Sequence, residues 1–146
     1  MLPAAPHPPA PYAPSTQGHL RAQLETTSFR ITEAHYQPGV RFADHAHEHH
    51  SITAVLDGGF SECFRSENQS CARQSVLIKP AARVHSNVYG DTLTRCLLVA
   101  VTQPIGAADR IFDRVSHVKG GSAFALLLAV RQELATADDL ASAAAE

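Results

Sequence analysis

Residues 39–59 of this 146-residue chain read GVRFADHAHEHHSITAVLDGG, and the fold is best predicted outward from this stretch. It contains the four histidines His45, His47, His49 and His50. An apolar run follows them and ends in Asp-Gly-Gly, a strong turn signal. Because side chains two residues apart share one face of a β-strand, His45, His47 and His49 are expected to point the same way. Neutral imidazole is the commonest protein metal ligand, so the pattern favours a metal site; a solvated strand end is the alternative.

A second stretch, residues 75–87, reads SVLIKPAARVHSN and predicts a short apolar strand, a proline turn and a further strand that carries His85. If this strand lies beside the first stretch, the imidazoles of His45, His47 and His85 converge. Three protein ligands with one open position are typical of a catalytic or ligand-accepting metal site rather than a closed structural one. We expect a divalent metal there, with zinc, iron, nickel and manganese all open, and we count His49 as a further candidate ligand.

Together the two stretches resemble the paired motifs of the cupin superfamily. The first motif is matched at Gly39, His45, His47 and Gly58. Ser51 stands where the family has a glutamate ligand, so the usual carboxylate is missing. The second motif is matched at Pro80, His85 and Asn87, while Gln74 and Ala82 replace its two glycines. The resemblance implies a double-stranded β-helix, or jelly-roll, barrel with metal ligands at its histidines.

A narrower resemblance is to the N-terminal sensor domain of AraC-type transcription regulators, and it spans roughly residues 29–139. It rests on VLDGGFSE (55–62), LIKPAARVHSNVYG (77–90) and TRCLLV (94–99). The resemblance implies a ligand-sensing and dimerisation domain that takes a small-molecule effector and ends before the DNA-binding domain. We therefore expect no specific DNA binding by this chain alone. The alternatives are a stand-alone small cupin metalloenzyme, dioxygenase- or isomerase-like, and a structural barrel whose histidines have no function.

The order of patterns predicts a mainly β fold with a short C-terminal helical segment. Short apolar runs separated by turn signals at intervals of about 8–12 residues are typical of a sandwich or barrel. We divide the chain into a proline-rich flexible tail (1–27), a cupin β-barrel (28–104) and a helical segment (105–146) that is cut short. That segment contains an amphipathic helix at 123–134 and a second helix capped by Thr136. We expect a homodimer because one small barrel leaves part of the first helix's apolar face uncovered.

Composition excludes several classes of protein. The formal net charge of −2 and only two lysines leave no basic surface for nucleic acid. No apolar run reaches the length of about 20 residues that a membrane span requires, and no signal peptide is visible. The three cysteines form no C-x-x-C pair and fit free thiols in a reducing compartment, so a cytoplasmic protein is expected.

Other polar residues are weaker candidates. We propose Arg83 and Tyr89 as ligand-binding residues, since a guanidinium and a phenol at the barrel mouth can meet an anionic or hydroxylated ligand. Glu62 is interpreted as a solvated strand residue, and Lys79 as part of a turn. Glu33 is expected to be exposed. We assign no catalytic residue.

Overall fold

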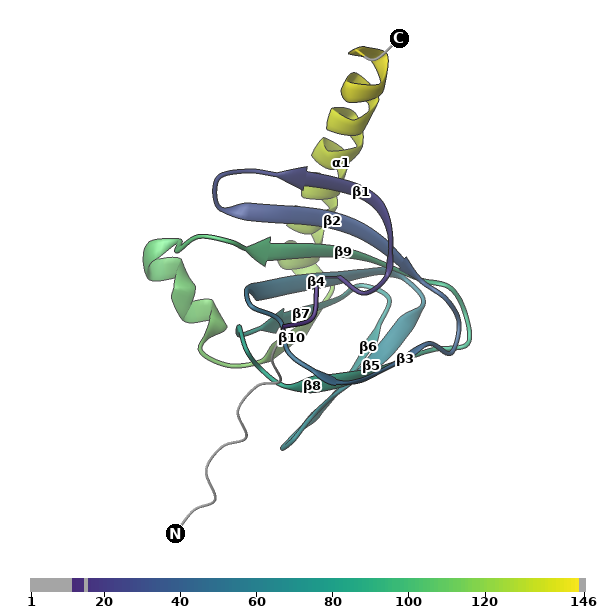
Figure 1. Cartoon of the computed structure of the whole chain (residues 1–146), viewed down its shortest axis with the longest axis vertical. Helices are drawn as coiled ribbons and strands as arrows, with labels where there is room; N and C mark the ends of the chain where they lie inside the picture. Colours follow the sequence, from purple (N-terminus) through teal and green to yellow (C-terminus); the bar gives the residue numbers. More distant parts are fainter. Residues whose placement is uncertain (1–11, 15, 145–146) are drawn as a thin grey trace.

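The computed structural model describes residues 12–14 and 16–144, which form two antiparallel sheets, a short 3-10 helix and one long α-helix (Figure 1). The larger sheet has the order β1-β2-β9-β4-β7-β10 and the smaller sheet the order β3-β8-β5-β6. The strands are β1 (His19–Glu25), β2 (Phe29–Tyr36), β3 (Arg41–His45), β4 (His50–Asp57), β5 (Gly59–Phe64), β6 (Asn68–Ala72), β7 (Ser75–Lys79), β8 (His85–Tyr89), β9 (Thr94–Val101) and β10 (Ser116–Lys119). The mainly β prediction is confirmed.

The central strands β4 and β9 of the larger sheet are largely buried on both faces, which explains why they are rich in apolar residues. In β4, Val55 points into the core between the two sheets, whereas Ala54 and Leu56 point to the opposite face. That opposite face is covered by α1 (Gly121–Ala144), whose Leu127 and Leu134 are buried against it. The core between the sheets contains Ala34, Tyr36, Val55, Phe60, Phe64, Cys71, Leu77, Tyr89, Cys96 and Val115.

The C-terminal segment forms one helix where two were expected. Residues 121–144 are continuous, and Thr136 lies inside the helix, with its hydroxyl donating to the carbonyl of Gln132. The prediction of a cap at Thr136 was therefore wrong: its hydroxyl bonds back four residues within the helix, as serine and threonine can in helix interiors. Figure 1 shows the end of α1 extending past the edge of the larger sheet.

The N-terminal boundary also differs from the expectation. Residues 19–25, assigned to the flexible tail, form β1 and pair with β2 along its whole length. Ala22 and Leu24 pack against the apolar cluster beneath α1, so this strand gains buried surface that its polar sequence does not reveal. Most of the proline-rich part of the tail lies outside the described residues. Among the described helices, none has the length and apolar character to cross a bilayer.

The strands β6 and β7 are separated by a tight turn at Arg73 and Gln74. Gln74 has φ of 72°, a left-handed conformation that allows its N–H to donate to the carbonyl of Val55 at 2.9 Å. Ala82, after β7, also has positive φ, at 60°. These are the two positions where the cupin motif has glycine, so the backbone keeps the glycine conformation although the residues have changed. Residues 105–118, assigned to the helical segment, contain the 3-10 helix η1 (Gly106–Phe112) and most of β10, a strand that extends the larger sheet beyond the expected barrel boundary at residue 104.

Candidate metal centre

Three of the predicted histidines meet at one end of the cavity between the sheets. His45 closes β3 and lies directly opposite His85, the first residue of β8. His47 follows in the loop, where an isolated bridge pairs it with Ala13. Each ring offers one nitrogen, and these three atoms lie within 4.8 Å of one another. The structure thus brings together residues from both cupin-like motifs, as strand pairing across the smaller sheet requires.

The backbone determines which nitrogen each ring presents. Nδ1 lies 2.7 Å from the Ala43 carbonyl in His45 and 2.8 Å from the Arg83 carbonyl in His85. Nδ1 of His47 lies 3.3 Å from the carbonyl of Ala13. A carbonyl oxygen only accepts hydrogen bonds, so each Nδ1 carries the proton and each Nε2 presents its lone pair. Metal-binding histidines are oriented in this way by their second nitrogen.

Two observations show that this set fits a divalent metal. Nε2 of His45 is buried and has no hydrogen-bond partner among the residues that the structure describes, although an unsatisfied buried acceptor is costly. Burial, followed by the charge of Lys79, lowers the pKa of His47 to about 4 and that of His85 to about 3. Both rings are therefore neutral near pH 7, which is the form that binds a metal.

The fourth candidate ligand, His49, does not join the group. β3 ends at His45 and β4 begins at His50, so the residues between them do not follow the alternation of one continuous strand. Nε2 of His49 lies 3.9 Å from a carboxylate oxygen of Glu48 instead. The expectation that His49 shares a face with His45 and His47 was wrong, because it assumed extended pairing through the whole cluster.

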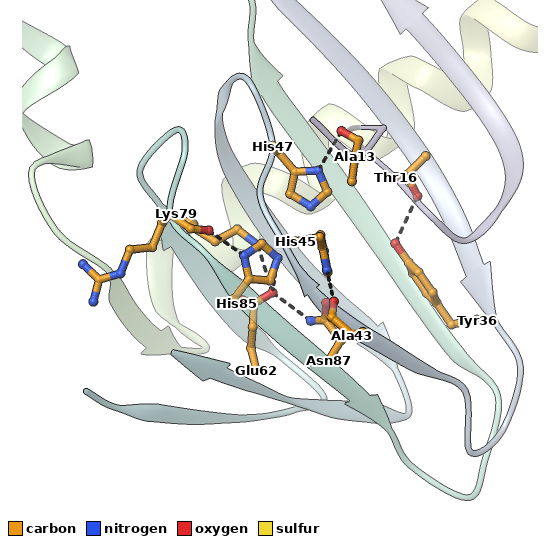
Figure 2. Close-up of polar contacts among 11 residues, drawn as sticks. Ala13, Thr16, Tyr36, Ala43, His45, His47, Glu62, Lys79, His85 and Asn87 are labelled. Carbon is orange, nitrogen blue, oxygen red and sulfur yellow. Dashed lines mark hydrogen bonds and ion pairs between the residues drawn. The ribbon is translucent and has the colours of Figure 1, made fainter. Parts of the chain in front are cut away.

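A buried charged pair that the sequence analysis missed lies beside the histidines (Figure 2). Glu62 was interpreted as solvated, but it is 3% exposed, and Lys79 is an inward-facing strand residue that is 7% exposed. Nζ of Lys79 lies 2.9 Å from Oε1 of Glu62, which also accepts from Nδ2 of Asn87 at 2.8 Å. The alternation of side chains in β5 could have indicated that Glu62 is buried, since it lies on the same face of the strand as the buried Phe60 and Phe64.

The carboxylate of this pair remains ionised because of the groups that surround it. Burial alone would raise the pKa of Glu62, but the Lys79 ammonium, His85 and the hydrogen bonds from Lys79 and Asn87 bring the net pKa below its usual value. One carboxylate oxygen, Oε2, is nevertheless buried without a hydrogen-bond partner in the described part of the chain. The site therefore contains a carboxylate with unused acceptor capacity, on a different strand from Ser51.

The cavity is small and mostly polar. Its volume is about 30 Å³, which admits an ion with one or two waters but not an organic effector in this conformation. Its lining comprises Gln17, Tyr36, Phe42, His45, His47, Ser51, Thr53, Phe60, Glu62, Lys79, His85, Asn87, Tyr89 and Leu98.

The two proposed ligand-binding residues lie in different places. Tyr89 lines the cavity, where its ring stacks on Tyr36 with centroids 4.2 Å apart. Arg83 is not among the lining residues: its guanidinium lies 5.5 Å from the centre of the Phe64 ring and 3.7 Å from a carboxylate oxygen of Glu67. Of the two, Tyr89 is therefore the one placed to contact a small group inside the barrel.

Several of the solved structures similar to this chain are described as cupins. A cupin superfamily protein of Desulfitobacterium hafniense DCB-2 aligns with a TM-score of 0.52 and 17% identity, over 70% of this chain and 95% of that one. The cupin domain of Schizosaccharomyces pombe Cnp3 gives 0.51 and 17%, over 66% and 77% of the two chains. KdgF from Halomonas sp. gives 0.50 and 17%, over 57% and 78%. No protein-family model matches this chain, and no curated protein does. At these identities the likeness shows the fold alone.

Proposed function

The chain has the cupin fold, and we propose that it is a metal-binding sensor domain of an AraC-type transcription regulator. The observation that supports metal binding is the convergence of one ring nitrogen each from His45, His47 and His85. In each ring Nδ1 is held by a backbone carbonyl, which leaves Nε2 as the nitrogen available to a metal. These residues would hold zinc, iron, nickel or manganese, since imidazole suits several first-row metals. A metal bound there supplies a Lewis acid with coordination positions left for a ligand.

The sensor role is supported by the sequence resemblance and by the way α1 is attached. β2 contributes Tyr36 to the cavity and Glu33 to the opposite face, where Glu33 binds Arg131 of α1. A ligand that changes the cavity therefore has a short physical route to the helix through one strand. We propose a small-molecule effector whose entry requires the cavity to widen, and no specific DNA binding by this chain alone. A mobility-shift assay that found sequence-specific binding would contradict the second point.

Metal binding is tested by thermal melts with and without zinc, nickel or manganese on untagged protein. Because the three ligands act on one ion, His45→Ala, His47→Ala and His85→Ala should each remove nearly all of the metal-induced shift. His19→Ala, an exposed residue of β1, is the control and should keep the full shift. If zinc stabilises His85→Ala as much as the unmodified protein, the shared site does not exist.

A second candidate, a small metalloenzyme, is favoured by one observation. Glu62 and Lys79 form a buried pair beside His85, and such groups can move protons at a reacting centre. Near-stoichiometric iron together with oxygen consumption on a thiol or diketone substrate would favour this function over sensing. Metal binding without turnover of such substrates would favour the sensor.

A further inference from the structure

Lys79 makes a contact that bears directly on metal binding. Its Nζ lies 3.0 Å from Nε2 of His85 and 2.9 Å from Oε1 of Glu62. Figure 2 shows the lysine side chain reaching from the end of β7 toward the ring of His85 and the carboxylate of Glu62. Since Nδ1 of His85 donates to the Arg83 carbonyl, Nε2 is the acceptor in the contact with Lys79.

This contact and a metal exclude each other at His85. A neutral imidazole has one lone pair on its unprotonated nitrogen, and that lone pair either accepts a hydrogen bond or binds a metal. A metal–nitrogen bond of about 2.0–2.1 Å along the same direction leaves no place for an ammonium 3.0 Å from that nitrogen. This inference rests on the proposed metal site. We propose that Lys79 competes with the metal for His85: its ammonium occupies the lone pair of the third metal ligand and must leave before a metal binds.

The charges of the site support an exchange rather than coexistence. With neutral histidines, Lys79 and Glu62 balance each other in a cavity where charge is poorly screened, so a divalent ion beside the ammonium would be strongly repelled. When Lys79 moves away, Glu62 loses its cationic partner. Its Oε1 lies 3.5 Å from Nε2 of His85, and its Oε2 has no hydrogen-bond partner within residues 12–14 and 16–144. The metal then replaces the ammonium beside the same carboxylate.

Lys79 lies next to the position where the cupin motif has a glutamate ligand and this chain has Ser51. Lys79 is directly opposite Ser51 in the pairing of β7 with β4, and both line the cavity. A serine at this position leaves more room for the facing side chain than the family's glutamate would. In this chain the negative charge near the histidines therefore comes from Glu62 of β5, and Lys79 controls access to it. The consequence is a site whose metal affinity is held down by one residue.

The test is zinc affinity of the full chain, measured by calorimetry or chelator competition at one pH. Lys79→Met keeps an unbranched apolar stem without the ammonium, and we expect its Kd for zinc to fall by roughly 10- to 100-fold. Lys119→Met is the matched control, since Lys119 is exposed on β10 and is the chain's other lysine. Its Kd should equal that of the unmodified protein. An unchanged or higher Kd for Lys79→Met overturns the competition.

Lys79→Met leaves Glu62 buried without its cation, which can prevent the variant from folding. A second variant without either charge therefore provides an independent test. Lys79→Met/Glu62→Gln removes both charges, and it should still bind zinc more tightly than the unmodified protein but less tightly than Lys79→Met. Adding His45→Ala to Lys79→Met should abolish the gain, which places the zinc at the histidines. A gain that survives this addition overturns the proposal.

A spectroscopic measurement separates this proposal from the proposed function. With isotope-labelled lysine, the chain gives two side-chain signals, and Lys119→Met identifies which belongs to Lys79. Zinc should shift the Lys79 signal and leave that of Lys119 unchanged. Zinc binding at the histidines without a shift of Lys79 overturns the competition while the metal site stands. Absence of zinc binding in both the unmodified protein and Lys79→Met overturns both.

Discussion

Arg131 of α1 and Glu33 of β2 form a two-point ion pair across the outer face of the larger sheet, with Nε and Nη2 each 3.0 Å from a different carboxylate oxygen. We expected Glu33 to be exposed, but its side chain is only 14% exposed. Parallel N–H···O contacts of this kind fix the direction of both side chains. The pair therefore holds the helix in one position on the strand that also carries Tyr36 into the cavity.

Arg131→Met should lower the free energy of unfolding by about 1 kcal/mol, because a partly buried carboxylate loses its two donors. Urea denaturation monitored by circular dichroism measures the change. Glu133→Gln, an exposed position on the same helix, should change stability by less than about 0.5 kcal/mol. Equal effects of the two variants would mean that the ion pair contributes nothing.

Glycine at either left-handed position should stabilise the fold. Gln74 and Ala82 have positive φ, a conformation that costs a residue with a side chain roughly 1–2 kcal/mol. Glycine avoids this cost but loses more backbone entropy on folding, which cancels only part of the gain. We expect Gln74→Gly and Ala82→Gly each to add about 0.5–1 kcal/mol to the free energy of unfolding. Ala81→Gly, next to Ala82, should instead destabilise by a similar amount. Thermal melts decide, and destabilisation by Ala82→Gly would contradict the argument.

His49 should be dispensable for metal binding. It lies in the loop between β3 and β4 and does not belong to the group formed by His45, His47 and His85. At a hundredfold excess of zinc over Kd, His49→Ala should keep the full stabilisation of about 2.7 kcal/mol. Calorimetry of zinc binding to His49→Ala gives the direct comparison. A loss as large as that of His85→Ala would make His49 a ligand after all.

The metal-free protein should lose stability as the pH falls below about 6.5. Burial, then Lys79, lowers the pKa of His85 to about 3 and that of His47 to about 4, whereas both titrate near 6.5 when unfolded. Between pH 6.5 and 4 the unfolded chain therefore binds more protons, and stability rises with pH by up to about 1.4 kcal/mol per pH unit for each histidine. Urea titrations from pH 7.5 to 4.5 measure this slope.

His85→Gln should reduce that slope, because glutamine does not titrate while it still offers an acceptor to Lys79. His19→Ala serves as the control and should leave the slope unchanged. A free energy of unfolding that stays constant between pH 6.5 and 4.5 would show that the buried rings are already charged in the folded state.

A homodimer remains a prediction. The apolar face of α1 packs on its own sheet through Leu127 and Leu134, but Leu126 and Leu140 are each 67% exposed. Light scattering at micromolar concentration should give twice the mass of one chain, and Leu126→Glu should shift the equilibrium toward monomer by introducing a charge into the contact. A monomer at all concentrations would exclude the dimer.

Much of the architecture could be predicted because its signals are local. Short apolar runs and turn residues predicted the mainly β fold, and the two motifs identified His45, His47 and His85. The errors arose where a neighbour overrides the local pattern. β1 is polar by sequence but is paired with β2, and the turn between β6 and β7 depends on Gln74, whose left-handed φ no local rule for glutamine predicts.

By itself the sequence determined that this chain forms a β-barrel with paired histidine motifs, since hydrophobic period, turn chemistry and histidine spacing are properties of short segments. Only the tertiary structure decided what surrounds those histidines. Lys79, Glu62 and His85 lie on three different strands, and their contacts exist because β5 pairs with β8 in one sheet while β7 faces them from the other. In the folded protein Lys79 and Glu62 are buried together beside His85, and their charges interact strongly because water no longer screens them.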